Sequence, residues 1–243
     1  LTHMFHQVEG ITKQDIADLG PISLLAMGPP CKDFSKFRKI VRPGDTRTAE
    51  QRRPGLKGVH GRIFLTCMKI RRWVIDLNPQ CVCLSEMVDF SDMKHQWSQV
   101  CNELGTPVML DAVNYSYTKR RRAFWTHNLT VPESVVKTRT PLNPDTCMDP
   151  GRTLIRDKGT APNLHVGTVG ASWREDGTAR TKKPVLVRDV NHTDAQHLRP
   201  HEAERLLGMP ANCTAAPGAT DVQRLTAIGN GWDINTLSLI MSC

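Results

Sequence analysis

A short apolar run, ISLLAM at residues 22–27, is the feature that most constrains the fold of this chain. Gly20 and Pro21 precede the run, and a Gly-Pro-Pro sequence follows it. An apolar run of this length between Gly and Pro is typical of a strand buried on both faces of a parallel sheet. Cys31 comes directly after this expected strand, and open α/β sheets bind ligands beyond the carboxyl ends of their strands. Cys31 is therefore a candidate functional residue.

Helix-like and strand-like segments alternate after this first strand. Helical periodicity covers residues 62–77, which Pro79 stops, and residues 94–104, which Gly105 closes. Such alternation predicts an α/β fold with a mostly parallel sheet and helices on both faces. The further strands are expected at 81–87, 107–113 and 122–126.

The second half of the chain has a different composition. Between about 128 and 198 it consists of Pro, Gly, Thr and scattered basic residues, which predicts a small lobe with little core of its own. A helix is expected to start at Arg199-Pro200, followed near the end by a helix, a turn at 229–231 and a helix capped by Asp233. We therefore expect three parts: a core at 1–127, a lobe at 128–198 and C-terminal helices at 199–243.

The charge of the chain indicates its class of partner. Among 243 residues, 32 Lys and Arg exceed 24 Asp and Glu, so the formal net charge is +8. Such a balance favours a polyanion such as nucleic acid, although a basic protein without that role is the alternative. The expected loop at 32–60 is rich in basic residues, as either a phosphate-binding loop or a solvated charge run would be.

Cysteine spacing and hydropathy exclude other classes. The eight cysteines form no CxxC pair and no cluster with zinc spacing, which argues against a structural metal site. Buried, reduced thiols of an intracellular protein explain them better than a disulfide framework. No apolar stretch approaches the length of a membrane span, and the first residues lack the layout of a signal peptide. We expect a soluble protein with no metal and no membrane association.

Three motifs stand at the ends of expected strands. They are Pro29-Pro30-Cys31, the segment SEMV at 85–88 and Arg120-Arg121-Arg122. Each motif alone is weak, because a lone Cys is usually a core residue, a strand-end Glu is usually solvated and an Arg triplet is usually surface charge. Their fixed order, with a basic loop after the Cys, makes the combination specific.

Together these motifs resemble the DNA (cytosine-5) methyltransferases, most closely the animal de novo class, over essentially the whole chain. The matching segments are GPPCKDFS, HGRIF, SEMV, TKRRRAFW, LRPHEAERLLGMP and RLTAIGNGW. The resemblance implies a Rossmann-like class I fold that uses S-adenosylmethionine, with a small target-recognition lobe at 128–198. It also implies methylation of carbon 5 of a cytosine in double-stranded DNA, and hence a nuclear location.

The chemistry requires residues of these types. Carbon 5 of cytosine is a poor nucleophile, and addition of the Cys31 thiolate to carbon 6 converts the ring to an enamine that is reactive at carbon 5. Glu86 would hydrogen-bond ring nitrogen 3 and so assist the attack. By resemblance, one of Arg120 and Arg122 contacts the base or its sugar-phosphate and the other supports Glu86. The target base must leave the duplex, because its stacked neighbours cover the ring.

The resemblance also supplies binding residues. Cofactor contacts are expected from Val8, Asn230, Gly231 and Trp232. Phosphate contacts are expected from the loop after Cys31 and from the lobe. The expected DNA-binding residues are Ser35, Lys36, Arg38, Lys39, Arg42, Arg152 and Arg156.

The match has two departures. Met87 stands where the family has Asn, so a hydrogen bond that helps to fix the loop around Glu86 is absent or replaced. The glycine-rich cofactor turn of the family is missing ahead of the first strand, and the segment QVEGIT at 7–12 resembles only a remnant of a later cofactor motif, with Gln7 in place of the usual Asp. We therefore expect an N-terminally incomplete methyltransferase sheet and weak or no binding of S-adenosylmethionine by this chain.

Two alternatives remain open at the level of sequence. One branch of the family methylates tRNA with the same motifs, and a non-catalytic relative that binds DNA or stimulates an active paralogue is the other possibility. Retention of Cys31 and Glu86 argues against the second. An oligomer, with itself or with a paralogue, is also open, because the apolar residues of 62–75 suit either an interface or the core.

Overall fold

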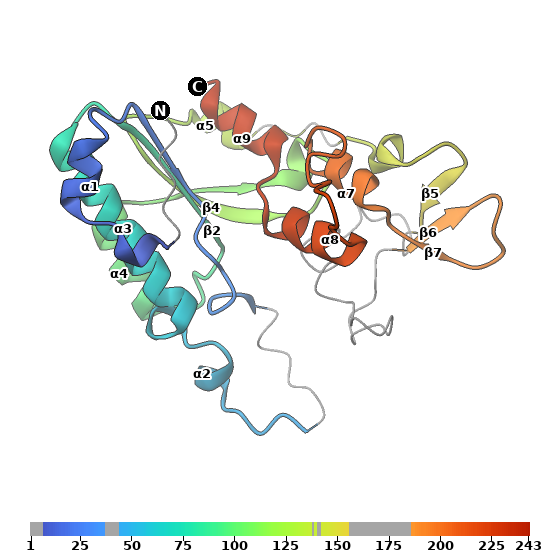
Figure 1. Ribbon diagram of the computed structural model, residues 1–243, viewed down its shortest axis with the longest axis horizontal. Helices are drawn as coiled ribbons and strands as arrows, with labels where there is room; N and C mark the ends of the chain where they lie inside the picture. The colour runs from blue at the N-terminus through green and yellow to red at the C-terminus, as the bar shows by residue number, and fades with distance from the viewer. Residues whose placement is uncertain (1–6, 37–43, 138, 140–141, 156–185) are drawn as a thin grey trace. The chain divides into compact units, whose positions relative to one another are not determined.

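The computed structural model describes residues 7–36, 44–137, 139, 142–155 and 186–243 (Figure 1). The chain divides into two compact units. The first comprises Leu1–Leu110 and Arg121–Pro132, and the second comprises Asp111–Arg120 and Glu133–Cys243. These boundaries differ from the three expected parts, 1–127, 128–198 and 199–243, whose separate roles stay a prediction.

A four-stranded sheet in the order β1-β2-β4-β3 forms the centre of the first unit. β1 and β2 are parallel, with Met27 opposite Ser85, whereas β2 and β4 are antiparallel. The α/β prediction is confirmed, but the sheet is mixed and not mostly parallel, because β4 runs back along β2. The strands are β1 (Leu24–Met27), β2 (Val82–Val88), β3 (Val108–Asp111) and β4 (Arg121–His127).

The helices of the first unit pack against one face of this sheet, and helices on the other face stay a prediction. Cys83 and Met87 lie on the same side of β2, and each belongs to an apolar cluster that includes residues of α3. α4 joins the cluster of Met87, and α1 contacts α3 (Figure 1). The helices are η1 (Val8–Gly10), α1 (Lys13–Asp18), α2 (Ala49–Arg52), η3 (Gly55–Lys57), α3 (Val59–Leu77) and α4 (Lys94–Leu104).

Helix α3 buries its apolar residues within its own unit. Phe64, Met68 and Val74 are at most 2% exposed, as their helical spacing predicts for one face of an amphipathic helix. This burial accounts for the apolar face of α3 without an oligomer, which stays a prediction. Gly105 ends α4 with φ of +89°, a conformation that only glycine adopts at little cost, and this confirms its predicted role.

The second unit joins the expected lobe to the C-terminal helices. Leu154 of β5 and Val187 of β6 share one apolar cluster with Leu206 of α7 and Ile228 of α8. The segment expected as a lobe therefore shares its core with these helices, and does not stand apart from them. The elements are η4 (Ala112–Asn114), α5 (Glu133–Lys137), η5 (Pro144–Cys147), β5 (Arg152–Leu154), β6 (Leu186–Asp189), β7 (Gln196–His197), α7 (Pro200–Leu206), α8 (Asp221–Asn230) and α9 (Ile234–Met241).

The ends of these helices test the sequence signals directly. α7 begins at Pro200, as predicted, and Asp233 caps α9 by accepting a hydrogen bond of 2.9 Å from the Thr236 amide. α8 continues to Asn230, so the turn expected at 229–231 is the last turn of a helix. None of the helices in the described part of the chain has both the length and the apolar character of a membrane span.

Candidate active site

The topology of the first unit brings three predicted residues to one edge of its sheet. β1 and β2 are parallel, so Cys31 and Glu86 both follow or lie near the carboxyl ends of their strands. β4 is antiparallel to β2, so Arg122, near its beginning, lies at that same edge. Order in the sequence alone predicted strand ends, and the pairing register places these three ends together.

Glu86 and Arg122 form an ion pair on the sheet face that α3 and α4 do not cover. Glu86 lies opposite Phe124 in the register, one diagonal step from Arg122. The Arg122 Nε atom is 2.6 Å from Oε1 of Glu86, and the two side chains are 16% and 11% exposed. A guanidinium held against a mostly buried carboxylate fixes the orientation of that carboxylate. Of the two predicted arginines, Arg122 is therefore the one that supports Glu86.

Met87 faces the opposite side of β2 from Glu86. It is fully buried, and it packs in the cluster that contains Phe34, Phe64 and Trp125. Successive side chains of a strand point to opposite faces, so residue 87 cannot share the face of Glu86. Met87 is thus a core residue beneath the sheet face that carries Glu86.

Cys31 begins a tight turn that is anchored in this same cluster. Its carbonyl oxygen accepts hydrogen bonds of 3.0 Å from the amides of Phe34 and Ser35. Phe34 is fully buried, with ring centroids 4.8 Å from Phe90 and 5.8 Å from Phe64. Cys31 itself is partly buried against the cluster. The backbone of the candidate nucleophile is therefore fixed by the packing of a neighbour three residues away.

The arginine triplet serves three different partners. Arg121 donates from Nε to the Asp89 carboxylate at 3.2 Å, and Arg122 pairs with Glu86. Arg120 belongs to the second unit, where its guanidinium donates to the carbonyl oxygens of Gly229 and Gly231, the latter at 2.6 Å. Arg120 thus holds the backbone of the terminal motif, and its predicted contact with the base stays a prediction.

The residues expected around the cofactor give few of the contacts that S-adenosylmethionine needs. A Cβ atom at Gly231 would lie 2.4 Å from Cε of Met209, so protein atoms already fill the space beside this glycine. Asn230 is exposed at the end of α8, and Trp232 is partly exposed. Val8, in the first unit, packs against the apolar cluster of Ile70 and Val74. Within the second unit, Asn230, Gly231 and Trp232 therefore do not fit the cofactor.

Of the residues predicted to bind DNA, two lie in the described part of the loop. Ser35 is partly buried, and Lys36 is exposed with its Nζ atom 3.0 Å from Asp89. Arg38, Lys39 and Arg42 lie outside the described residues, as does Arg156.

The prediction for Arg152 is corrected by its burial. Its side chain is 3% exposed, and its guanidinium contacts Glu202 at 2.7 Å, Asp189 at 3.1 Å and the His197 carbonyl oxygen at 2.7 Å. A guanidinium enclosed by two carboxylates is not available to a phosphate. Arg152 therefore stabilises the second unit, and the sequence could not reveal this because its partners lie far along the chain.

Sequence reasoning missed the residues that hold the turn of Cys31. Asp33 is buried and caps α3, since its Oδ2 atom accepts a hydrogen bond of 2.9 Å from the His60 amide and a longer one, of 3.4 Å, from that of Gly61. Arg53 donates from Nε to the Phe34 carbonyl oxygen at 2.8 Å, and both of its terminal nitrogens donate to the Asp92 carboxylate. Their only sequence signal is a pair of charges within a basic loop.

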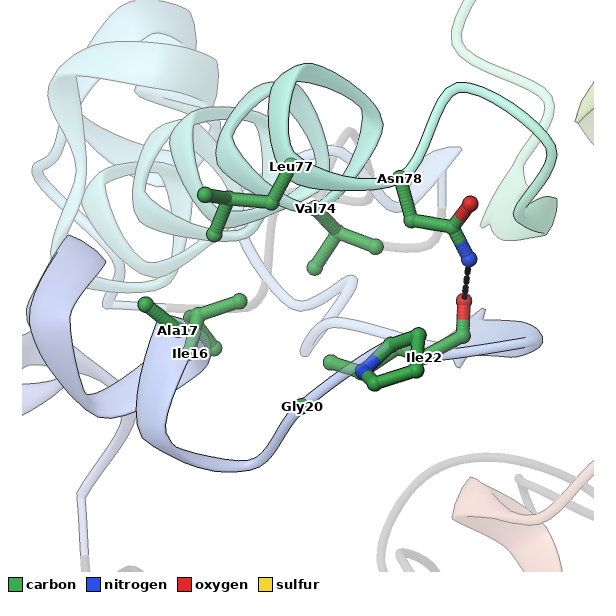
Figure 2. A pocket seen from close by; sticks show the side chains of 8 residues that line it. Ile16, Ala17, Gly20, Ile22, Val74, Leu77 and Asn78 are labelled. Carbon is green, nitrogen blue, oxygen red and sulfur yellow. Dashed lines mark hydrogen bonds between the residues drawn. The ribbon is translucent and has the colours of Figure 1, made fainter.

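A cavity of about 250 Å³ lies at the other end of β1 (Figure 2). Ile16, Val74 and Leu77 line it, and Asn78 closes one side by donating to the Ile22 carbonyl oxygen at 2.9 Å. This cavity is lined in part by residues that precede β1, whereas Cys31 follows β1, so the cavity is separate from the edge that carries Glu86 and Arg122. Across the described ranges, no group of three or more His, Cys, Asp or Glu side chains is placed to hold a metal ion.

Comparison with known proteins adds the fold. No family model matches the sequence. A methyltransferase of Entamoeba histolytica, EhMeth, aligns with a TM-score of 0.59 at 12% identity over 100% of this chain and 82% of its own. The Dnmt2 methyltransferase of S. pombe aligns with a TM-score of 0.56 at 14% identity over 99% and 82%. This is a methyltransferase fold.

A bacterial protein shares the same fold. A prophage-encoded E. coli protein, named for DNA modification by methyl transfer, aligns with a TM-score of 0.53 at 13% identity over 99% of this chain and 86% of its own. The Rossmann-like fold expected for a methyltransferase is thus confirmed. At these identities the likeness concerns the fold alone.

Proposed function

We propose that this chain activates cytosine in DNA for methylation at carbon 5, through covalent addition of Cys31. The proposal is supported by the Glu86–Arg122 pair, 2.6 Å apart, near the carboxyl end of β2 in a methyltransferase fold, and by Cys31, which follows the neighbouring parallel strand β1 by four residues. A thiol and an oriented carboxyl group are the two groups that this addition requires.

The proposed steps use only residues of the first unit. The Cys31 thiolate forms a bond to carbon 6 of the cytosine, the double bond between carbons 5 and 6 opens, and a proton from water reaches ring nitrogen 3 through the Glu86 carboxyl group. Arg122 keeps the Glu86 carboxyl group directed at the base. The resulting enamine is nucleophilic at carbon 5, which is where a methyl group would be accepted. The donor implied by the fold is S-adenosylmethionine, and because its expected residues do not fit it, the proposal covers activation of the base alone.

DNA is the proposed substrate for three reasons. The net charge of +8 and the exposed Lys36, five residues after Cys31, suit a polyanion, and one protein of the same fold is named for DNA modification. Carbon 6 of a stacked base is covered, so the proposal includes extrusion of the base from the duplex. A nuclear location would follow if the DNA is chromosomal. Cytosine in tRNA is the alternative substrate with the same chemistry.

Hydrogen exchange at carbon 5 tests this proposal without a methyl donor. In water the enamine takes a proton at carbon 5. Loss of the original hydrogen to water and departure of the thiolate then restore cytosine. Duplex DNA containing cytosine tritiated at carbon 5 should therefore release tritium when incubated with the protein, and Cys31→Ser should abolish the release. Equal release by the Cys31→Ser variant would refute the proposal. Faster release from tRNA than from duplex DNA would support the alternative substrate.

A further inference from the structure

The Cys31 turn is held from outside by a buried arginine. Arg53, 22 residues further along the chain, donates from Nε to the Phe34 carbonyl oxygen at 2.8 Å. The Phe34 amide in turn donates to the Cys31 carbonyl oxygen at 3.0 Å. Two hydrogen bonds therefore connect the Arg53 guanidinium to the backbone of Cys31.

The guanidinium itself has little freedom. Its two terminal nitrogens bind the two oxygens of Asp92, and the side chain of Arg53 is 7% exposed. A two-point contact between Arg and a carboxylate fixes direction as well as distance. Asp92 lies just ahead of α4. The contact between Arg53 and Asp92 therefore fixes the turn of Cys31 relative to α4.

The residues that follow Arg53 also contact both the turn of Cys31 and α4. The Gly55 amide donates to the Asp33 carbonyl oxygen at 3.1 Å, and the Leu56 amide donates to Oε1 of Gln96 in α4 at 2.6 Å. Gly55 has φ of +58°, and a Cβ atom there would lie 1.9 Å from that Gln96 oxygen. Residues 53–56 thus pack closely between the turn of Cys31 and α4.

We infer that Arg53, held by Asp92, is a positioning residue for the Cys31 nucleophile. The expected effect of Arg53 on catalysis rests on the proposed function. The expected effect of Arg53 on the accessibility of the Cys31 thiol does not depend on that function. Without the Arg53 contact, packing of Phe34 keeps the turn near its place, while the Cys31 sulfur loses its fixed direction. Catalytic addition is sensitive to misplacement of about 1 Å, and such errors cost up to about 100-fold in rate.

Arg53→Lys is the test variant, since it keeps the charge and most of the stem but cannot bind Asp92 and Phe34 together. Arg72→Lys is the control, because Arg72 pairs with Glu103 between α3 and α4, away from the turn. In the tritium release assay, Arg53→Lys should lower kcat about tenfold or more with KM little changed, whereas the control should match the unmodified protein. Asp92→Asn should give a smaller loss in the same direction.

Alkylation of Cys31 by iodoacetamide supplies a second readout that needs no activity. Mass spectrometry of peptides should show faster labelling of Cys31 in Arg53→Lys, because a loosened turn exposes its partly buried thiol. Cys67 and Cys83, which are buried in the same unit, report global unfolding and should stay unlabelled. Unchanged labelling of Cys31 together with unchanged kcat would overturn the inference, as would equal labelling of all three thiols. If the unmodified protein released no tritium, the proposed function would fail, and the labelling of Cys31 would still decide the role of Arg53.

Discussion

The Arg122 guanidinium and the Glu86 carboxylate lie on adjacent antiparallel strands with 2.6 Å between Nε and Oε1. A mostly buried pair of this kind is costly to break on one side, because the remaining charge stays buried without its partner. The pair therefore links the chemistry proposed for Glu86 to a contact that can be altered one residue at a time.

Replacement of Glu86 by Gln should nearly abolish base activation. The amide keeps the shape of the side chain but cannot donate an acidic proton to ring nitrogen 3, and loss of such a group costs about 10² to 10⁴ in rate. Tritium release from duplex DNA measures the effect. Asp76 is an exposed residue of α3 that pairs with Lys13 of α1, and Asp76→Ala should leave tritium release unchanged. Release by Glu86→Gln within twofold of the unmodified protein would contradict the assigned role.

Replacement of Met87 by Asn should destabilise this chain. Met87 is fully buried among apolar side chains, so Met87→Asn would bury an amide without partners and lose apolar packing, at a cost of roughly 2–4 kcal/mol. Urea unfolding measures the free energy of unfolding. Met87→Leu conserves volume and should cost less than about 1.5 kcal/mol. A more stable Asn variant would show that residue 87 finds polar partners.

Removal of the Asp33 carboxylate should weaken α3 at its start. The carboxylate accepts hydrogen bonds from the amides of His60 and Gly61 in the first turn of this helix, and loss of such a cap costs about 1–2 kcal/mol. The free energy of unfolding of Asp33→Ala should fall by this amount. Asp76→Ala near the other end of α3 is the matched control, and an equal loss in both variants would argue against a capping role.

Asp89 should make the stability of the first unit depend on pH in acid. Burial acts to raise the pKa of Asp89, but hydrogen bonds from Ser91 and from Lys36 outweigh it and lower the pKa from 3.8 to about 2. A lowered folded-state pKa stabilises the protein above the unfolded value, and this contribution disappears as pH falls from about 4 to about 2. The stability difference between the unmodified protein and Asp89→Asn should therefore shrink over this interval. A constant difference from pH 6 to pH 2.5 would exclude this linkage.

S-adenosylmethionine should bind this chain weakly or not at all. Met209 fills the space beside Gly231, and Asn230 is exposed and offers no enclosed contact. Calorimetric titration of the protein with S-adenosylmethionine measures the affinity directly. Micromolar binding would show that residues other than those expected form the donor site.

Local signals predicted much of the fold correctly. The glycine after α4, the proline that begins α7 and the aspartate that caps α9 act within one helical turn, so their chemistry is complete in the sequence. The direction of β4 and the packing of the first unit's helices against the Met87 face of the sheet were not predictable in this way. They depend on pairing between strands far apart in the chain, which spacing alone does not encode.

The same distinction between local and long-range features applies to the candidate site. Motif order predicted Cys31, Glu86 and Arg122, because each stands at the end of a recognisable strand. Arg53 and Asp92 escaped notice, since a buried ion pair has no periodicity and resembles surface charge until its partners are known. Arg152 was misassigned for the same reason, as its basic character suggested phosphate although its partners are internal.

Arg53, Arg71, Arg120 and Arg152 are all at most 8% exposed. An arginine enclosed by protein displaces no counterions from a polyanion, so these side chains should not contribute to the ionic-strength dependence of the proposed DNA association. Salt titrations of binding should accordingly give a slope shallower than the number of basic residues in the sequence suggests. The electrostatic reach of this molecule is thus set by where its cations are placed and not by how many it carries.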